Sequence, residues 1–405
     1  MRILLINHYA GSPEHGMEFR PYYLAREWVR HGHHVRIVAS SFSHLRSHNP
    51  SFDGPSQLRT ADGIEYYWLR TRPYRGNGAA RLRNMVEFTA KLWRTGTALV
   101  NERPDVVIAS STYPYDIWPA ARIARRAGAR LVHEIHDLWP LTPKLLGGFG
   151  ARHPMIASMQ WAEDYACRNA DRIVSILPGT KEYLETRGMA AEKFVHVPNG
   201  FDPEAARQAA PADVVYRIRA FAQRYKASCI YAGGHSVSNA LDTLIEVAAR
   251  PEVADIGFIL IGDGTEKERL VAQARRDRIS NILFLDPVSK AAVPSVLVLA
   301  DFAYIGWRNS PLYDHGMSPN KLFDYMSAAL PVLHATSAPY DIVAQAQCGL
   351  SVPADDVGAI ARAAALLGDT SPQERNRLGG NGCRYARTHH AYPVLAHQFL
   401  QAMQP

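Results

Sequence analysis

The stretch MSPNKLFDYM (317–326) places a serine, a proline, an asparagine and a lysine at the start of an amphipathic segment. Ser318 can accept hydrogen bonds from the free backbone N–H groups of a helix start, and Pro319 suits the first helical position, where no donor is needed. The first turn would present unpaired N–H groups and the positive end of the helix dipole, to which Lys321 adds a full charge. The stretch therefore predicts a helix whose start binds an anion such as phosphate.

A carboxylate lies one turn further into the same segment. Asp324 follows Lys321 by three residues and therefore shares its face of the helix. A carboxylate beside a phosphate site is well placed to accept hydrogen bonds from sugar hydroxyls. The stretch, with Asn320 between its proline and lysine, thus predicts a nucleotide-sugar site. The alternative is an exposed helix start with an ordinary ion pair between Lys321 and Asp324.

Regular elements able to hold such a site recur along the whole chain. Short apolar runs alternate with longer segments of helical period, which is typical of stacked βαβ units with parallel sheets. We predict strands at residues 2–7, 34–39, 64–69, 105–110, 129–135 and 172–177, and again at 228–233, 256–262, 281–285, 301–306, 331–335 and 349–353.

A turn cluster, VPNGFDP (197–203), divides this pattern into two halves. A chain of 405 residues is too long for one ordinary core. We predict an α/β protein with two doubly wound Rossmann-like domains facing across a cleft, residues 1–199 and 200–388, and an amphipathic segment 389–405 that packs back on the first. Because ligands bind at the carboxyl ends of parallel strands, the predicted site belongs in that cleft.

The bulk properties exclude several protein classes. Apolar residues make up 47% and charged residues 20%, as in soluble globular proteins. No apolar run approaches the ~20 residues that span a bilayer, and MRILLINHYA is too short and too soon interrupted to be a signal peptide. Four scattered cysteines indicate neither a disulfide framework nor a zinc site. We therefore expect a cytoplasmic protein.

The net charge of +7 is concentrated in the first half, where residues 1–200 hold 26 Lys and Arg against 18 Asp and Glu. Much of it falls in segment 66–96, in which Met85, Phe88, Leu92 and Trp93 alternate with basic residues. A basic amphipathic helix can lie on anionic lipid, which suits a polyprenyl-diphosphate-linked acceptor and contact with the inner face of the plasma membrane. The alternative is a surface helix with its apolar stripe in the core. We expect no nucleic-acid partner, because no reader motif accompanies the charge.

Six strings in a consistent order carry a family resemblance. They are NHYAGSPEHGMEFRPYYLAREWVRHGHHV, EIHDLWP (134–140), LPGTKEYLETRG, VHVPNGFDP, IGDGTEKERL (261–270) and MSPNKLFDYMSAALPVL. In these strings the chain resembles the retaining GT-B glycosyltransferases of family four, in the bacterial branch that builds O-antigens, capsules and exopolysaccharides. The resemblance covers nearly the whole chain.

The resemblance implies retaining transfer of a hexose or N-acetylamino hexose from a UDP-sugar to a lipid-linked or saccharide acceptor. It implies front-face substitution, in which a donor phosphate oxygen helps to take the acceptor proton, without a protein nucleophile. We expect no cofactor and no metal requirement, because helix N–H groups and Lys321 can do the work of a divalent ion and no DxD string is present.

The chain departs from the family pattern in its acidic pair. Family members have two acidic residues eight apart around this helix start, of which the second holds the ribose and the first lies near the donor hexose. Asp324 stands at the second place and Gly316 at the first. The hexose contact then has to come from backbone or from Asp314 or His315.

A second departure lies in the glycine-rich loop GGHSVSNALD (233–242). Many members bring an arginine and a lysine from this loop to the diphosphate, and Gly234 and Asn239 stand at those places here. The resemblance therefore leaves neutralisation of the diphosphate to Lys321, the helix start and Arg308.

The resemblance also assigns residues outside this stretch. It places His136, at a strand end, near the donor hexose, where the alternative is a buried, satisfied histidine. Gly16 could let backbone approach the donor, or could simply form a βα turn with positive φ. The predicted catalytic residues are His136, Lys321 and Asp324. The predicted donor-binding set is Gly16, Gly234, Asn239, Asp263, Gly264, Val288, Gly316, Ser318, Pro319, Asn320, Lys321, Leu322 and Asp324.

One further donor residue and three acceptor residues have structural alternatives. Asp263 either lies beside the nucleotide or only turns the chain. Glu18 and Arg20 open the helix after the first strand and either face the acceptor or are solvated first-turn charges. Asp137 either contacts the acceptor or caps the following turn. The backbone around Val288 is expected to pair with the base edge.

Two rival functions remain open for this architecture. A non-hydrolysing UDP-N-acetylamino-sugar 2-epimerase would need carboxylates around the sugar C2, which the glycine at position 316 disfavours. A catalytically silent nucleotide-binding subunit is disfavoured by the group formed by Asn320, Lys321 and Asp324.

Overall fold

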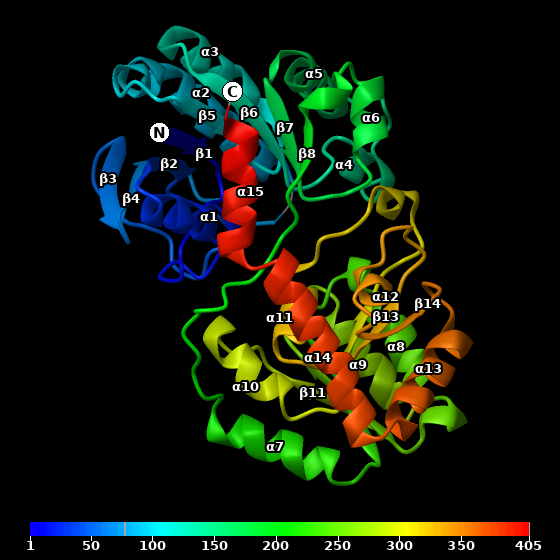
Figure 1. The fold of residues 1–405 in the computed structure, drawn as a ribbon. Helices are drawn as coiled ribbons and strands as arrows, with labels where there is room; N and C mark the ends of the chain where they lie inside the picture. The colour runs from blue at the N-terminus through cyan, green and yellow to red at the C-terminus, as the bar shows by residue number, and fades with distance from the viewer. Residues whose placement is uncertain (77, 405) are drawn as a thin grey trace. The chain divides into compact units, whose positions relative to one another are not determined.

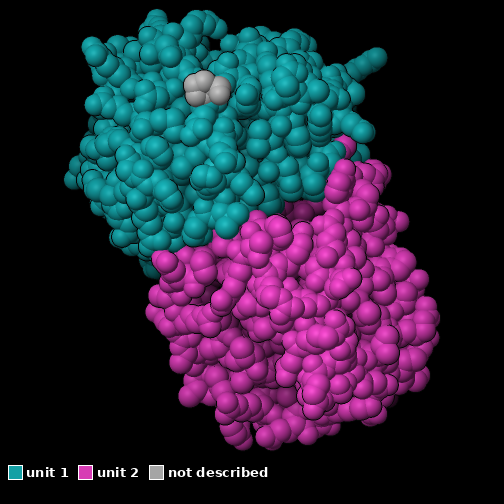
Figure 2. Space-filling view, in the orientation of Figure 1, with its two compact units in different colours: residues 1–199, 392–405 teal, residues 200–391 magenta. Residues whose placement is uncertain are grey.

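The computed structural model describes residues 1–76 and 78–404, which pack into two compact units. Unit 1 holds residues 1–199 and 392–405, and unit 2 holds residues 200–391; Figure 2 gives each its own colour. Each unit has a parallel sheet with helices on its faces (Figure 1).

Unit 1 contains an eight-stranded sheet in the order β3-β4-β2-β1-β5-β6-β7-β8. All neighbouring strands are parallel except β3 and β4, which pair antiparallel. Its elements are β1 (Arg2–Ile6), α1 (Phe19–Arg30), β2 (His34–Ser40), β3 (Ser56–Ala61), β4 (Ile64–Leu69), α2 (Ala79–Asn101), β5 (Val106–Ala109), α3 (Ile117–Ala127), β6 (Arg130–Ile135), α4 (Leu141–Leu145), α5 (Pro154–Asn169), β7 (Arg172–Ser175), α6 (Lys181–Thr186), β8 (Phe194–His196) and α15 (Tyr392–Met403).

Unit 2 contains a six-stranded, wholly parallel sheet in the order β11-β10-β9-β12-β13-β14. Its elements are α7 (Ala212–Ala222), β9 (Ala227–Ala232), α8 (Leu241–Ala248), β10 (Ile256–Ile261), α9 (Lys267–Arg276), β11 (Ile282–Leu285), α10 (Val293–Leu297), β12 (Phe302–Gly306), α11 (Asn320–Ser327), β13 (Val332–Ala335), α12 (Ile342–Gln345), β14 (Gly349–Val352), α13 (Val357–Asp369) and α14 (Pro372–His389).

The C-terminal helix α15 packs on α1 in unit 1 (Figure 1). Trp28 of α1 is fully buried, its indole N–H donates to the carbonyl of Ala396 at 3.0 Å, and its ring meets Phe399 edge-on. The sequence predicted a returning segment from residue 389. In the structure α14 runs on to His389 and the returning helix begins at Tyr392.

Each sheet reverses its strand order at one point, and ligands of open parallel sheets bind beside the carboxyl ends of the strands there. In unit 1 the reversal lies between β1 and β5, which are followed by Asn7 and Ser110. In unit 2 it lies between β9 and β12, which are followed by Gly233 and Trp307. These two strand ends are the places to look for a site.

The predicted α/β architecture with two parallel sheets is confirmed, and every predicted strand is present to within two residues at each end. Strands β3 and β8 were not predicted. The first is an edge strand, SQLRTA. Its residues are largely exposed and mostly polar, so they show no alternation of apolar and polar positions. The second has only three residues.

Within the basic segment 66–96, residues 66–69 end β4 and residues 79–96 form most of α2, while residue 77 lies outside the described residues. Met85, Phe88 and Leu92 are buried within unit 1, so the alternative reading of a stripe packed in the core is correct for them. Val86 and Trp93 remain exposed on the same helix. Over residues 1–76 and 78–404, none of the helices is both long and apolar enough to cross a bilayer.

Candidate functional site

Helix α11 begins at Asn320, with Pro319 in an extended conformation at its cap position (φ −78°, ψ 126°). The prediction that Ser318 caps the helix and that Pro319 is its first helical residue is wrong by one position, since Pro319 is the cap and Asn320 is the first helical residue. The N–H of Leu322 donates to the carbonyl of Pro319 at 3.1 Å, and its side chain is buried in the core. The N–H groups of Asn320 and Lys321 are therefore left at the helix start.

Lys321 turns its side chain toward the end of β9. Its Nζ donates to the hydroxyl of Tyr231 at 2.9 Å and to Oδ1 of Asn239 at 2.5 Å. The ammonium lies 4.8 Å from the centre of the Tyr231 ring and 5.7 Å from that of Trp307. The cation is thus held by neutral oxygens and two aromatic rings.

The glycine-rich loop after β9 closes around the same lysine. The Tyr231 hydroxyl donates to the carbonyl of Gly234 at 2.7 Å, and the amide nitrogen of Asn239 donates to that carbonyl and to Ser236 Oγ, both at 2.8 Å. The structure therefore brings Gly234, Asn239 and Lys321 together. Tyr231, which contacts both Lys321 and Gly234, was not singled out from the sequence.

The electrostatics of this group favour an anion. None of the carboxylates that the structure describes forms an ion pair with Lys321, and burial lowers the pKa of its ammonium to about 7. A group with a pKa so depressed by desolvation is stabilised in its charged form when an opposite charge arrives. The environment of Lys321 is therefore one in which a bound anion would stabilise the charged ammonium.

Trp307, directly after β12, is held by a hydrogen-bond chain through His334 to Asp341. Its indole N–H donates to Nε2 of His334 at 3.3 Å, and Nδ1 of His334 lies 3.0 Å from Oδ1 of Asp341. Because an indole can only donate, Nε2 accepts and the imidazole proton lies on Nδ1, facing the carboxylate. This arrangement holds one of the two rings beside Lys321, and no sequence motif indicated it.

Asp324 accepts a hydrogen bond from Nζ of Lys290 at 2.5 Å rather than from Lys321. The alternative of an ion pair within the helix is therefore wrong. Lys290 lies in the short 3₁₀ segment Lys290–Ala292 after β11 and was not predicted. Both side chains retain exposure, so the carboxylate is accessible to a ligand that displaces the lysine.

Arg308 is already paired with carboxylates, which counts against its predicted role at the diphosphate. Its guanidinium pairs with Asp242 and, at 3.2 Å, with Asp355. Two carboxylates therefore already neutralise this cation.

The position vacated by the first acidic residue is a tight backbone site. Gly316 is buried and has φ 90° and ψ 176°, a conformation that an L side chain rarely adopts, and its N–H donates to the carbonyl of Tyr313 at 2.9 Å. Asp314, just before it, is exposed. The backbone conformation at position 316 therefore favours a glycine over an acidic residue.

The remaining donor candidates lie in loops after β10 and β11. Oδ1 of Asp263 accepts the N–H of Gly264 at 2.8 Å, which matches the alternative that it turns the chain; both residues are exposed. Val288 is half-buried against the core of unit 2, and its backbone N–H and C=O form no hydrogen bond within the described residues. Its backbone thus remains available for a planar polar edge.

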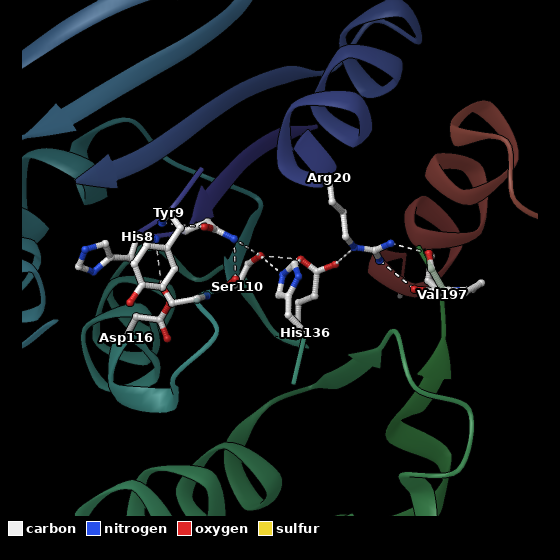
Figure 3. A network of polar contacts seen from close by, with 11 residues as sticks. His8, Tyr9, Arg20, Ser110, Asp116, His136 and Val197 are labelled. Carbon is white, nitrogen blue, oxygen red and sulfur yellow. Dashed lines mark hydrogen bonds and ion pairs between the residues drawn. The ribbon is translucent and has the colours of Figure 1, made fainter. Parts of the chain in front are cut away.

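In unit 1 the candidate histidine belongs to a network at the ends of β1, β5 and β6 (Figure 3). Nε2 of His136 lies 3.0 Å from Ser110 Oγ and 3.3 Å from Oε2 of Glu134. Asn7 donates to the carbonyl of Ser110 at 2.7 Å, and Ser110 Oγ donates to Glu134 at 2.6 Å. Nδ1 of His136 forms no hydrogen bond to a described residue, so it is the nitrogen left for a ligand.

Glu134 is the fully buried centre of that network. Burial acts to raise its pKa, but Arg20, His136 and Ser110 outweigh burial and lower it to about 2. A carboxylate held ionised in this way favours the proton of His136 on Nε2 and fixes the ring orientation. Neither Glu134 nor Ser110 was predicted, although EIHD (134–137) contains the glutamate.

The predicted acceptor role of Arg20 is wrong. Its side chain is 1% exposed, and its guanidinium donates to Glu134 at 2.9 Å and to the carbonyls of Pro198 and Val197 at 2.5 and 2.8 Å (Figure 3). A cation committed to three buried acceptors cannot face a substrate, nor is it a solvated first-turn charge.

Asp137 closes the turn after β6, as its alternative reading proposed. It accepts hydrogen bonds from the N–H of Leu138, the indole of Trp139 and the hydroxyl of Thr142, at 2.8, 3.1 and 2.6 Å. Burial raises its pKa even so.

Glu18 and Gly16 lie at the entrance to α1. Glu18 is half-buried, its pKa is raised by burial and lowered in part by His136, and its carboxylate has no hydrogen-bond partner among the described residues. Gly16 has φ 88°, and a Cβ there would lie 2.7 Å from Ser47 Oγ. Glu18 therefore remains a candidate for substrate contact. Gly16 is accounted for by its turn, which requires a positive φ and leaves no room for a Cβ.

Across residues 1–76 and 78–404, no group of three or more His, Cys, Asp or Glu side chains is arranged to hold a metal ion.

Two family models match the chain in sequence. One, described as a glycosyl transferase 4-like domain, matches residues 15–200, and the other, described as glycosyl transferases group 1, matches residues 226–369. A relative in Escherichia coli strain K12, WcaI, provisionally described as a colanic acid biosynthesis glycosyl transferase, is 27% identical over 281 residues, which cover 68% of this chain and 69% of WcaI.

Two solved structures share the fold over almost the whole chain. Sucrose-phosphate synthase from Thermosynechococcus elongatus has a TM-score of 0.73 at 15% identity and covers 99% of this chain and 98% of its own. Anabaena HepE in complex with UDP and glucose has a TM-score of 0.68 at 16% identity and covers 98% of both chains. With both halves matched by glycosyltransferase models and the whole fold shared with these structures, the chain belongs to the GT-B glycosyltransferases of family four.

Proposed function

We propose that this glycosyltransferase moves a hexose or N-acetylamino hexose from a UDP-sugar to a lipid-linked or saccharide acceptor in cell-surface polysaccharide biosynthesis, with retention of anomeric configuration. The observation that carries the proposal is Lys321, a desolvated ammonium at the start of α11 that pairs with none of the described carboxylates. Support comes from the description of WcaI, which concerns colanic acid, and from HepE, which was solved with UDP and glucose.

In this proposal the diphosphate lies at the start of α11. Lys321 and the N–H groups of Asn320 and Lys321 donate to its oxygens, and a charge that grows on the departing diphosphate is stabilised by donors already in place. The lysine supplies the positive charge, so the proposal requires no metal.

The nucleoside is assigned to neighbouring groups of unit 2. Asp324 accepts hydrogen bonds from the ribose hydroxyls, in exchange for its contact with Lys290, and the free backbone groups of Val288 pair with the uracil edge. Both assignments use hydrogen-bonding capacity that is weakly held or unused in the ligand-free protein.

In unit 1 we assign His136 to the transferred sugar. With its proton on Nε2 toward Glu134, Nδ1 accepts a hydroxyl hydrogen bond, and when the ring is protonated Nδ1 donates instead. The proton of the acceptor hydroxyl passes to a phosphate oxygen of the donor, so no protein carboxylate becomes covalently bound to the sugar.

The test is a panel of UDP- and GDP-sugars with polyprenyl-diphosphate-linked acceptors, in the presence and absence of EDTA. We expect transfer from one UDP-sugar, undiminished by EDTA, and an axial product linkage from an axial donor in the NMR spectrum. Incubation with UDP-N-acetylglucosamine alone tests the epimerase: rapid inversion at C2 without an acceptor would contradict transfer. A lack of turnover with every donor would favour a silent binding subunit.

A further inference from the structure

A groove of about 970 Å³ crosses the surface of unit 1 between α2, α3 and α5. These three helices lie side by side along one face of the sheet (Figure 1). Trp93 of α2, Trp118 of α3 and Trp161 of α5 all line the groove. A groove of this size, walled by aromatic rings, falls in the range that holds a drug-sized apolar ligand or a lipid chain.

The apolar lining is accessible to solvent. Trp161 is 65% exposed, Val86 is 54% exposed and Trp93 is 46% exposed, although large apolar side chains usually cluster in the core. The rings of Trp118 and Trp161 lie 5.0 Å apart, so they form one continuous surface. Exposed tryptophans grouped in this way mark a surface that another apolar phase covers.

The rim of the groove is positively charged. Arg122, Arg125 and Arg126 line it from α3, and none of them forms an ion pair with a carboxylate of the described residues. The Arg122 guanidinium instead lies 4.7 Å above the Trp93 ring. The described residues that line the groove include no aspartate or glutamate, so the charge of its rim calls for an anionic partner.

We propose that this groove is the surface by which the enzyme binds an anionic phospholipid bilayer. Tryptophan rings partition to the interface between headgroups and acyl chains, and arginines bind lipid phosphates there. This surface differs from the apolar stripe predicted for α2, because Met85, Phe88 and Leu92 of that stripe are buried. The inference deepens the proposed function and rests on it, since an enzyme that uses a lipid-linked acceptor has to reach the membrane.

Vesicle sedimentation of the full chain tests the proposal, without donor or acceptor. The probes are vesicles of phosphatidylcholine alone and of phosphatidylcholine with phosphatidylglycerol, at low and high salt. The variants are Trp161→Ala and the double variant Arg125→Glu/Arg126→Glu. The matched control, Tyr216→Ala/Arg275→Glu, removes an exposed aromatic and reverses an exposed arginine on α7 and α9 of unit 2.

We expect salt-sensitive binding to vesicles that contain phosphatidylglycerol, at least about tenfold weaker in the arginine double variant and clearly weaker in Trp161→Ala, with the control unchanged. Equal binding to both vesicle types, or variants that bind like the parent, would overturn the proposal. Binding that appears only after polyprenyl phosphate is added would also overturn it. So would a molar mass of Trp161→Ala, measured by sedimentation without lipid, that differs from that of the parent, because it would indicate that the groove is a contact between copies of the chain.

The binding of UDP distinguishes failure of this inference from failure of the proposed function. The groove variants should bind UDP with the affinity of the parent chain. Loss of vesicle binding with UDP affinity retained supports the groove, and UDP binding without any vesicle binding overturns it while leaving the donor site standing.

Discussion

The ammonium of Lys321 and the hydroxyl of Tyr231, 90 residues apart in the chain, lie 2.9 Å apart and join the start of α11 to the end of β9. That contact sits where the strand order of the second sheet reverses. The hydroxyl donates its own hydrogen bond to the carbonyl of Gly234. The lysine is therefore oriented by neutral groups, which leave its charge uncompensated. An arriving diphosphate would find the cation already placed.

Replacing Lys321 with alanine should weaken UDP binding by about 1.5 to 3 kcal/mol, the scale of a charge-assisted hydrogen bond. Isothermal titration calorimetry measures the change. Lys226→Ala is the matched control, because that lysine pairs with Asp369 on the exposed surface. Equal losses in the two variants would mean that overall charge, rather than this site, determines the affinity.

UDP binding at pH 8 should draw up to about one proton from solution. Burial lowers the pKa of Lys321 to about 7, so at pH 8 this side chain is neutral in most molecules of the free protein. A bound diphosphate raises that pKa. Calorimetry in two buffers of different ionisation enthalpy counts the protons. Lys321→Met should abolish the uptake, and an unchanged proton count in this variant would assign the uptake to another group.

The same pKa predicts a pH dependence of stability in the free protein. Between the pKa of about 7 in the folded chain and the ordinary lysine pKa of 10.5 in the unfolded chain, the unfolded chain binds the proton and the folded chain does not. The free energy of unfolding should therefore gain a positive slope as pH rises through this range. Urea unfolding of the parent and of Lys321→Met, compared at pH 7 and pH 9.5, should show a smaller rise in the variant.

Asp324→Ala should weaken the binding of UDP more than that of 2′,3′-dideoxy-UDP, because the proposed contact is to ribose hydroxyls. The fold should stay intact, since the ion pair lost is a partly exposed one with Lys290, worth about 0 to 1 kcal/mol. Lys290→Ala is the control and should leave UDP affinity unchanged or raise it. Equal losses of both nucleotides in Asp324→Ala would remove the ribose from this position.

Arg20→Ala should destabilise the fold by about 3 to 5 kcal/mol, since it leaves the Glu134 carboxylate buried without its cation. Arg377→Ala, which breaks the exposed pair with Glu374, should leave the free energy of unfolding close to that of the parent. Chemical denaturation at pH 7 compares the two. If Arg20→Ala were as stable as the parent while losing only acceptor affinity, the acceptor role rejected above would be restored.

Much of the fold could be predicted because buried parallel strands leave a strong apolar signal. Every run such as RILLIN and IGFILIG became a strand, and the alternation with helical segments fixed the two sheets. The edge strand β3 escaped because its residues are exposed and polar, and pairing at an edge depends on its neighbour rather than on its own sequence.

The site was predictable to the extent that it lies within one short stretch. Lys321 and Asp324 share a helix, and their spacing decides their common face. Their partners could not be predicted, because Tyr231 and Lys290 approach from other strand ends through the order of strands in the sheet. Arg20 failed for the opposite reason: a charge at a helix start is usually solvated, and only tertiary packing against Glu134 buries this one.

The most direct test is a crystal structure of the protein soaked or grown with UDP. The account predicts a diphosphate oxygen at about 2.7 to 3.2 Å from Nζ of Lys321, with the N–H groups of Asn320 and Lys321 directed at the same phosphate. A diphosphate bound elsewhere, with Lys321 still bonded only to Tyr231 and Asn239, would contradict it.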